Sequence, residues 1–240
     1  KHEMTTWRPS NANGSFSGVY EGIARTQTDL DNHATQQGVN VGDCLYKDIS
    51  GPEGTPDGVI DAYDQTVLGS GLPKVNFGLS THMEYKGFDL NISTYGVLNY
   101  HVSDDIYNSL NSCYGYGNKE VGMLDANRWS EDGTYLSSVP RTYAANNATL
   151  AWNDLFSSRK IQNAAYWKIA NVELGYNFPD KWFGGYVSGV RLYVSAQNLY
   201  TFTGYHGYNV DYAGGTFTPG YNFCSFPSAR TFMCGLHFTF

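Results

Sequence analysis

The last twelve residues of the 240-residue chain alternate between two kinds of side chain. One set of alternate positions is mostly large and apolar and includes the final residue: Phe232, Cys234, Leu236, Phe238 and Phe240. The intervening set is smaller or more polar: Met233, Gly235, His237 and Thr239. Successive side chains of a β-strand point to opposite faces, so the pattern predicts a strand at about 229–240 with one apolar face.

A strand of this kind has two interpretations. It is either the core strand of a soluble β-domain or the last strand of an outer-membrane β-barrel, where a terminal aromatic faces lipid. In the barrel interpretation, Leu236, Phe238 and Phe240 form the C-terminal signal of the strand that closes the barrel.

The clearest hairpin lies between residues 74 and 100. Alternating segments at about 74–86 and 87–100 flank Lys86-Gly87, and a two-residue turn there places Tyr85 opposite Phe88. The resulting register gives the hairpin one apolar and one hydrophilic face, as expected for tilted strands between lipid and an aqueous lumen. The hydrophilic face pairs Glu84 with Asp89, so a wet lumen or a nearby cation is needed to relieve this like-charge contact.

Further strands are predicted at about 1–9, 164–178 and 189–203, with long loops at about 10–73, 101–163 and 204–228. Strict alternation places Ala170, Val172 and Leu174 on the apolar face of their strand. Long and short connections alternate, as in transmembrane barrels with long extracellular loops and short periplasmic turns. Aromatic residues gather at the inferred periplasmic end, as in an interfacial girdle: Tyr85, Phe88, Tyr176, Phe178 and Phe240.

These patterns predict an all-β protein, specifically a transmembrane antiparallel β-barrel. Only about six strands are identifiable, whereas the smallest such barrels have about 8 and hydrocarbon does not tolerate open sheet edges. We therefore expect the C-terminal part of a larger barrel. The net charge of −7, with scattered basic residues, argues against nucleic acid as a partner.

No feature of the sequence indicates an enzyme. The motifs of serine hydrolases, zinc proteases and P-loop proteins are absent. No convergent partner is identifiable for the carboxylates of the strands and turns: Glu84, Asp89, Glu173 and Asp180. We expect three loop carboxylates to be solvated: Asp104, Asp105 and Asp211. The four cysteines, which include no CxxC pair, are expected to be free, with a disulfide among the first three as the alternative: Cys44, Cys113, Cys224 and Cys234.

Five stretches together resemble one family. Residues 42–50 (GDCLYKDIS) and 57–69 (DGVIDAYDQTVLG) are similar to the GD-x-x-YKD and GDGVID-x-x-D-x-T-x-x-G signature of SusC/RagA-type TonB-dependent transporters. The segments YKGFDL (85–90), RLYVSAQNLYTFTGY (191–205) and PSARTF (227–232) follow in the family's order.

The resemblance implies a barrel of roughly 22 strands with a plug, located in a Bacteroidota-type bacterial outer membrane with its loops extracellular. It implies an active importer of oligosaccharides or peptides. The implied partners are the remaining N-terminal barrel and plug part, a SusD-like surface lipoprotein, TonB, outer-membrane lipid and the substrate. A passive porin or structural barrel and a soluble β-sandwich ligand-binding module are the alternatives.

The segment from Asp48 to Asp64 is a candidate calcium site, although no cofactor is required. Asp57, Val59, Asp61 and Asp64 follow part of the spacing of an EF-hand-type loop, with Asp48 and Ser50 matching its first half. The insertion at 51–56 breaks that spacing. The alternative is an ordered turn in which aspartate side chains cap backbone amides.

Aromatic residues of the long loops are candidates for contact with a substrate or partner, because rigid aromatic rings suit sugar stacking and protein interfaces. The candidates are Trp129, Trp152, Tyr205, Tyr208, Tyr212 and Tyr221. The alternatives are loop-on-loop packing or an upper girdle. Glycans and peptides are not distinguished by these residues.

Overall fold

The computed structural model describes residues 18–113, 118–121, 129–130, 139–142, 152–183, 187–211, 214–215, 218–223 and 225–239. The chain divides into two compact units. The sheet unit comprises Pro73–Tyr100, Asn163–Tyr212 and Ser225–Phe240, and the loop unit comprises Lys1–Leu72, His101–Gln162 and Ala213–Cys224. The predicted strand at about 1–9 lies outside the described residues. Within the described ranges, no helix is long and apolar enough to cross a membrane.

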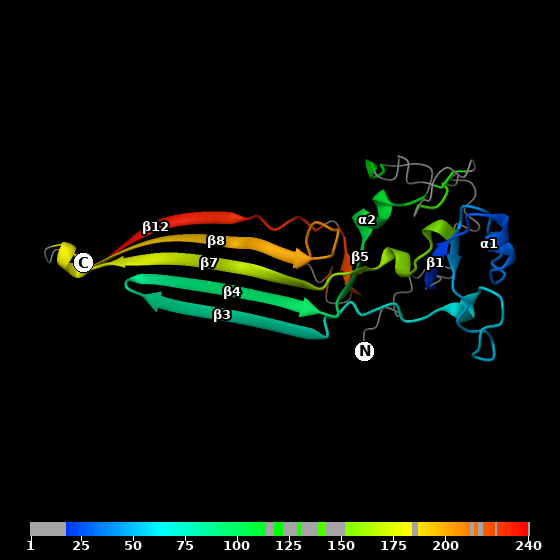
Figure 1. Ribbon diagram of the computed structural model, residues 1–240, viewed down its shortest axis with the longest axis horizontal. Coiled ribbons are helices and arrows are strands. Elements are labelled where there is room, and N and C mark those ends of the chain that lie inside the picture. Colours follow the sequence, from blue (N-terminus) through cyan, green and yellow to red (C-terminus); the bar gives the residue numbers. More distant parts are fainter. Residues whose placement is uncertain are drawn as a thin grey trace. The chain divides into compact units, whose positions relative to one another are not determined.

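Five antiparallel strands form the sheet unit, side by side in the order β12-β8-β7-β4-β3 (Figure 1). Their bounds are β3 Val75–Tyr85, β4 Phe88–Leu98, β7 Tyr166–Phe178, β8 Gly189–Thr203 and β12 Thr231–Thr239. These strands coincide with the alternating segments of the sequence. Among the described strands, β3 and β12 are the edges of the sheet.

Lys86 and Gly87 form the turn between β3 and β4, with φ angles of 47° and 90°. Positive φ at both central residues is the requirement of the type I′ turn, whose twist matches that of the flanking strands. Tyr85 pairs with Phe88, and the register continues without a shift to the far ends of both strands. The predicted hairpin register is therefore confirmed.

A β-bulge at Ala170 interrupts β7. Asn171 and Ile169 pair with consecutive residues of β4, so Ala170 is an extra residue in its strand. Before the bulge the alternation changes phase, so that Ile169 and Trp167 share the apolar face while Lys168 faces the polar side. Strict alternation therefore does not continue through Ala170, because a bulge resets which side chains point to which face.

The loop unit contains short elements within segments predicted as loops. They are β1 Tyr20–Ile23, α1 Gln27–Asp31, β2 Cys44–Tyr46, η2 Ala62–Asp64, β5 His101–Asp104, α2 Asp105–Leu110, η4 Trp152–Asp154, η5 Ser158–Lys160, β9 Gly214–Gly215, β10 Thr218–Pro219 and β11 Tyr221–Asn222. The 3₁₀-helix η6, Asp180–Trp182, lies in the turn after β7, and β6, Gln162–Asn163, spans the division between the units. β1 pairs with β2, β9 with β10, and β11 with β5.

Polar caps explain several of these short elements. Thr26 and Asp29 form a capping box at α1, with the Thr26 hydroxyl accepting from Asp29 N at 3.3 Å and Asp29 Oδ2 accepting from Thr26 N at 2.9 Å. Asp104 caps α2 by accepting from Tyr107 N at 2.9 Å. Such local bonds specify structure without any periodic apolar pattern, so the periodicity of the sequence does not reveal them.

The core of the loop unit is small and mixes apolar and polar groups. Cys44, Tyr46, Ile60 and Trp152 are its buried members. The Tyr46 hydroxyl donates to the Trp152 carbonyl at 2.5 Å, and the two rings lie 5.8 Å apart between centroids. Trp152 Nε1 in turn donates to the Gln37 carbonyl at 2.9 Å. Each buried polar tip thus has a partner, as a buried aromatic requires.

Candidate functional site

One face of the sheet is a continuous exposed apolar surface. Large apolar side chains on it are all at least 42% exposed: Leu79, Met83, Leu174, Leu192, Val194, Leu236 and Phe238. Soluble monomers rarely expose so large a contiguous apolar patch. We call this surface, from β3 to β12, the apolar wall.

Two aromatic belts bracket the aliphatic part of the apolar wall. The first lies at the end with the short turns, where Phe88 and Tyr176 are 4.6 Å apart and Tyr176 and Phe178 are 4.9 Å apart between ring centroids. Tyr85 pairs with Phe88 there, and Phe240, the remaining predicted member, lies outside the described residues.

The second belt lies at the opposite end of the strands and was missed by the sequence analysis. Trp167 stacks on Phe202 at 5.4 Å, and Phe202 contacts Tyr200 at 4.7 Å. From Trp167 to Tyr176 the strand makes about 8 regular steps around the bulge, which is roughly 26 Å of strand or about 20 Å of depth at the usual tilt. This approaches the apolar band of about 25 Å in membrane barrels.

The opposite face is polar and carries an ionic cluster. Arg191 on β8 donates to both carboxylate oxygens of Asp89 on β4, at 3.1 and 2.5 Å, and to Glu173 on β7 at 2.6 Å. Asn177 Nδ2 donates to the same Asp89 at 3.0 Å. Asp89 and Glu173 therefore do converge on a partner, contrary to the sequence-based expectation, because strand pairing brings Arg191 next to residues 102 and 18 positions away in the sequence.

Glycines make room for this cluster. A Cβ at Gly175 would lie 2.5 Å from Asp89 Oδ1 and 2.7 Å from Arg191 Nη2. A Cβ at Gly235 would lie 2.6 Å from the Tyr193 ring, which itself contacts the Arg191 guanidinium. The side chains of Arg191, Asp89 and Tyr193 therefore lie flat across neighbouring strands.

A second ion pair ties the loop after β8 to the sheet. The Lys168 ammonium, almost fully buried, contacts Asp211 Oδ2, and the Tyr95 hydroxyl donates to the same oxygen at 3.3 Å. Asp211 Oδ1 is buried and accepts no hydrogen bond from the part of the chain that the structure describes. The expectation that Asp211 is simply solvated is therefore wrong, because Lys168 faces this side through the bulge at Ala170.

In the loop unit, Asp43 joins three distant stretches of sequence. Its carboxylate accepts from Arg141 at 2.6 and 2.8 Å, and from Asn153 Nδ2 at 2.9 Å. These bonds raise the pKa of Arg141 above its ordinary value. Next to it Gly42 has φ 94°, and a Cβ there would lie 2.6 Å from the Trp129 ring. Gly42 and Asp43 thus hold together the loop segments that contain Trp129, Arg141 and Asn153. The sequence analysis did not predict this structural role.

Asp104 and Asp105 also have partners in the loop unit. Asp104 is 3% exposed and accepts from Asn222 Nδ2 at 2.9 Å, in addition to its cap of α2. Asp105 accepts from the Tyr221 hydroxyl at 2.9 Å. The prediction that both are solvated is wrong, because the parallel pairing of β5 with β11 brings these side chains together.

The predicted loop aromatics have different surroundings. Trp152 and Tyr205 are 8% and 7% exposed, while Trp129 is partly exposed beside Gly42. Tyr221 stacks on Phe223 at 6.5 Å, and Tyr208 is 65% exposed. Tyr212 lies outside the described residues. Of the described candidates, Tyr208 is thus the most open to a ligand or partner.

The acidic segment is held by its own backbone amides. Asp64 is fully buried and accepts from Ile49 N at 2.8 Å, Ser50 N at 3.2 Å and Asp61 N at 2.8 Å. The same pattern holds for the other carboxylates, since Asp48 accepts from Gly58 N, Asp57 from Val59 N and Asp61 from Tyr63 N. No group of three His, Cys, Asp or Glu in the described residues could hold a metal ion. Calcium binding here stays a hypothesis.

Two cysteines are buried thiols of the loop unit. Cys44 and Cys113 are both fully buried and free, and Cys234 is an exposed free thiol on the apolar wall. Burial raises the pKa of Cys44 to about 12 and that of Cys113 to about 11. Cys224 lies outside the described residues.

Known proteins resemble this chain in sequence and in fold. No protein-family model matches the sequence. The chain is 30% identical to TonB-dependent receptor P3 of Formosa agariphila over an alignment 243 residues long. The alignment covers 97% of this chain and 23% of that receptor. It is 27% identical over 186 residues, 77% of its length, to TonB-dependent receptor SusC of Bacteroides thetaiotaomicron, of which it covers 17%.

The chain is related to the TonB-dependent receptors, SusC among them. It spans about a fifth of the length of these relatives. Its fold matches a structure of the RagAB peptide transporter with a TM-score of 0.70 and 21% identity, over 94% of this chain and 22% of that one. The match with the RagAB peptide importer in the open-open state has a TM-score of 0.67. The family resemblance predicted from the sequence motifs is confirmed.

Proposed function

We propose that this chain forms part of the wall and the external loops of an active outer-membrane nutrient importer. The observation that carries the proposal is a five-stranded sheet with one exposed apolar and one polar face, in a chain similar to TonB-dependent receptors along 97% of its length. An apolar face between aromatic belts suits lipid, and a polar face suits an aqueous lumen.

The parts of the chain have different roles in this proposal. The apolar wall faces the bilayer, with the short turns toward the periplasm and the long connections outside. The cluster around Arg191 lines the lumen, where a strong local ionic network keeps the polar face in a fixed shape. The loop unit, with its buried core and its Asp43 anchor, is a preformed platform on which a SusD-like lipoprotein docks as a lid. TonB supplies energy through parts of the receptor beyond this chain.

The substrate proposed is an oligosaccharide or a peptide. The similarity in fold to the RagAB peptide transporter supports a peptide, while the exposed Tyr208 suits either class. The function we infer is transport rather than catalysis, and it is supported by the ion pairs that three carboxylates of the polar face, Asp89, Glu173 and Asp211, form with Arg191 and Lys168.

The proposal is tested by fractionating cells that produce the complete receptor, followed by pull-down and intact-mass analysis. We expect the receptor in the outer membrane together with a SusD-like lipoprotein. Uptake of a candidate glycan or peptide by these cells should stop when a protonophore collapses the proton gradient. Uptake that continues without energy would favour a passive porin, and a chain that stays soluble without detergent would favour a soluble binding module.

A further inference from the structure

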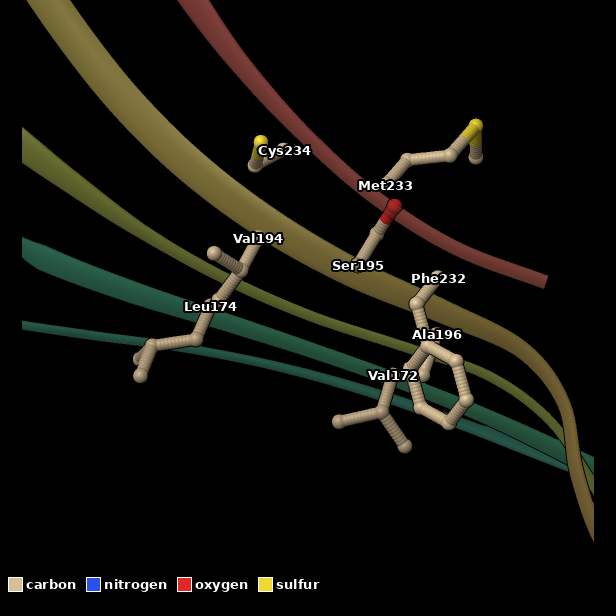
Figure 2. A pocket seen from close by; sticks show the side chains of 8 residues that line it. All are labelled: Val172, Leu174, Val194, Ser195, Ala196, Phe232, Met233 and Cys234. Carbon is tan, nitrogen blue, oxygen red and sulfur yellow. The ribbon is translucent and has the colours of Figure 1, made fainter.

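The apolar wall contains a hollow across β7, β8 and β12. Its volume is about 440 Å³, within the range of small-ligand sites. The lining residues are Val172, Leu174, Val194, Ser195, Ala196, Phe232, Met233 and Cys234. Figure 2 shows Val172, Ala196 and Phe232 at one end of the hollow and Leu174 with Val194 at the other.

The strand register explains the hollow. Ala196 pairs with Val172 on one side and with Phe232 on the other, so a single methyl group lies between two larger side chains. In the adjacent row Val194 pairs with Cys234, another short side chain. One row further toward the turns, Leu192 pairs with Leu236, and both are large side chains. The hollow therefore lies over the short side chains of Ala196 and Cys234 and is bounded by larger ones.

The hollow lies nearer the short turns than the loops. Leu174 and Val172 are two and four positions from Tyr176 of the turn-end belt, which is about 5–10 Å of depth at the usual strand rise and tilt. The belt that contains Trp167 is further away, beyond the bulge. With the short turns at the periplasm, the hollow is at the level of the acyl chains of the periplasmic leaflet.

Positive charge lies at the same end of the strands. The two short turns each contain a lysine, Lys86 and Lys181, and Lys181 is exposed beside Trp182, itself 65% exposed. Lysine and tryptophan together are suited to the level of lipid headgroups. Because β7 and β8 lead directly from Lys181 to the floor of the hollow, an anionic phosphate and an apolar chain can be bound along the same two strands.

We propose that this hollow binds one acyl chain of a phospholipid of the periplasmic leaflet, with its phosphate at Lys181. The inference rests on the proposed function, which places the apolar wall in the bilayer. The lining contains no charged side chain, as hydrocarbon requires. A protein partner is disfavoured because a protein interface has a polar rim around its apolar core, whereas this hollow is surrounded by further aliphatic residues.

The test uses the complete receptor, extracted in a mild detergent and analysed by native mass spectrometry with added phosphatidylglycerol. Ala196→Phe fills the hollow, and we expect it to weaken phospholipid retention at least tenfold. Leu192→Phe, which adds bulk on the same strand and face outside the lining, should retain lipid like the wild type. Lys181→Gln should weaken retention several-fold without changing the hollow.

Equal retention by the Ala196→Phe and wild-type receptors would overturn the inference, as would retention of lipid A in place of a phospholipid. If Ala196→Phe fails to assemble, as judged by heat-modified gel mobility, Ala196→Leu and Lys181→Gln supply the same comparison.

A separate measurement distinguishes failure of the inference from failure of the proposed function. A fluorophore on Cys234, in a receptor with Cys224→Ser, should be quenched by brominated acyl chains and not by aqueous iodide. Quenching by iodide alone would overturn the membrane assignment of the wall itself. Quenching by brominated lipid together with an unaffected Ala196→Phe variant would overturn only the specific binding site.

Discussion

Arg191 on β8 reaches across β7 to Asp89 on β4 and bonds both of its carboxylate oxygens, at 3.1 and 2.5 Å. The hairpin register alone pairs Asp89 with Glu84, a like-charge contact that needs a cation. Arg191 is that cation. Because it also bonds Glu173, one guanidinium holds three strands of the sheet together on the polar face.

Removal of the Arg191 guanidinium should destabilise the sheet. In Arg191→Met, Asp89 stays 4% exposed with no cation, so we expect a loss of about 1–3 kcal/mol, lower than for a fully buried pair because Arg191 is partly solvated. The measurement is the unfolding midpoint of the assembled receptor in detergent micelles as the concentration of guanidinium chloride is raised. Glu84→Gln, an exposed change on the same face, should shift the midpoint little. A midpoint for Arg191→Met equal to that of the wild type would show that water on the polar face already solvates Asp89.

Adding a methyl group at Gly175 should also destabilise the sheet, because it would clash with the side chains of Asp89 and Arg191. The added Cβ would lie 2.5 Å from Asp89 Oδ1 and 2.7 Å from Arg191 Nη2, so Gly175→Ala must displace the ion pair. We expect a loss of about 1–3 kcal/mol in the same unfolding experiment, typical of overpacking. Gly78→Ala is the matched control, since its Cβ would meet only Thr94 O at 3.7 Å. Equal stability of the two alanine variants would contradict the role assigned to Gly175.

The strands were predictable because their alternation is long, and the hairpin register was predictable because Lys86-Gly87 fits only a short turn. The bulge at Ala170 was not, since a strand with one extra residue and a strand without it differ little in composition. The sequence did contain one signal: strict alternation would place Lys168 on the apolar face and Trp167 on the polar face. A lysine in mid-strand among apolar residues is a reason to expect a change of phase.

The candidate site was less predictable than the fold. The partners Asp89–Arg191 and Asp43–Arg141 are about 100 positions apart, and no local pattern connects them. Trp152 was predicted as a contact residue because it lies in a polar loop, yet it forms a core with Tyr46 and Cys44. Composition identifies a loop as polar, but only long-range pairing decides which of its aromatic residues are buried.

The Lys168–Asp211 pair should keep residues 204–211 on the sheet. In Asp211→Ala the almost fully buried Lys168 ammonium loses its counter-ion, so this segment should open more often. We expect amide hydrogen exchange in residues 204–211 to accelerate at least tenfold, while β8 remains protected. Tyr208→Ala, which removes an exposed side chain of the same segment, is the control. Unchanged exchange in Asp211→Ala would mean that the buried Val210 and Tyr205 suffice to hold the segment.

The two buried thiols should make the loop unit sensitive to alkaline pH. Folding raises the pKa of Cys44 to about 12 and of Cys113 to about 11, whereas an unfolded thiol ionises near about 8.5. Their contribution to stability is therefore complete below about pH 8.5 and declines as the pH rises toward 11–12, by up to about 1.4 kcal/mol per pH unit for each thiol. In Cys44→Ala this decline between pH 8.5 and 11 should be shallower.

The stability is measured from the urea concentration at which the buried thiols become open to labelling by iodoacetamide, with the label detected by mass spectrometry. Rapid labelling of Cys113 in the folded receptor at pH 8 would contradict its burial.

The acidic segment should depend on Asp64 more than on calcium. Asp64 accepts from three backbone N–H groups, and Asp64→Ala leaves them without a partner inside the turn, so we expect a local loss of about 2–4 kcal/mol. Asp57→Ala removes one acceptor of an exposed bond and should cost less. Susceptibility of residues 48–64 to limited proteolysis measures both effects.

Because the carboxylates already accept from the backbone, calorimetric titration with calcium should give no heat of binding. Tight calcium uptake that is lost in Asp57→Ala would instead establish the metal site, with Asp48 Oδ1, which is buried and has no hydrogen-bond partner among the described residues, as a further candidate ligand.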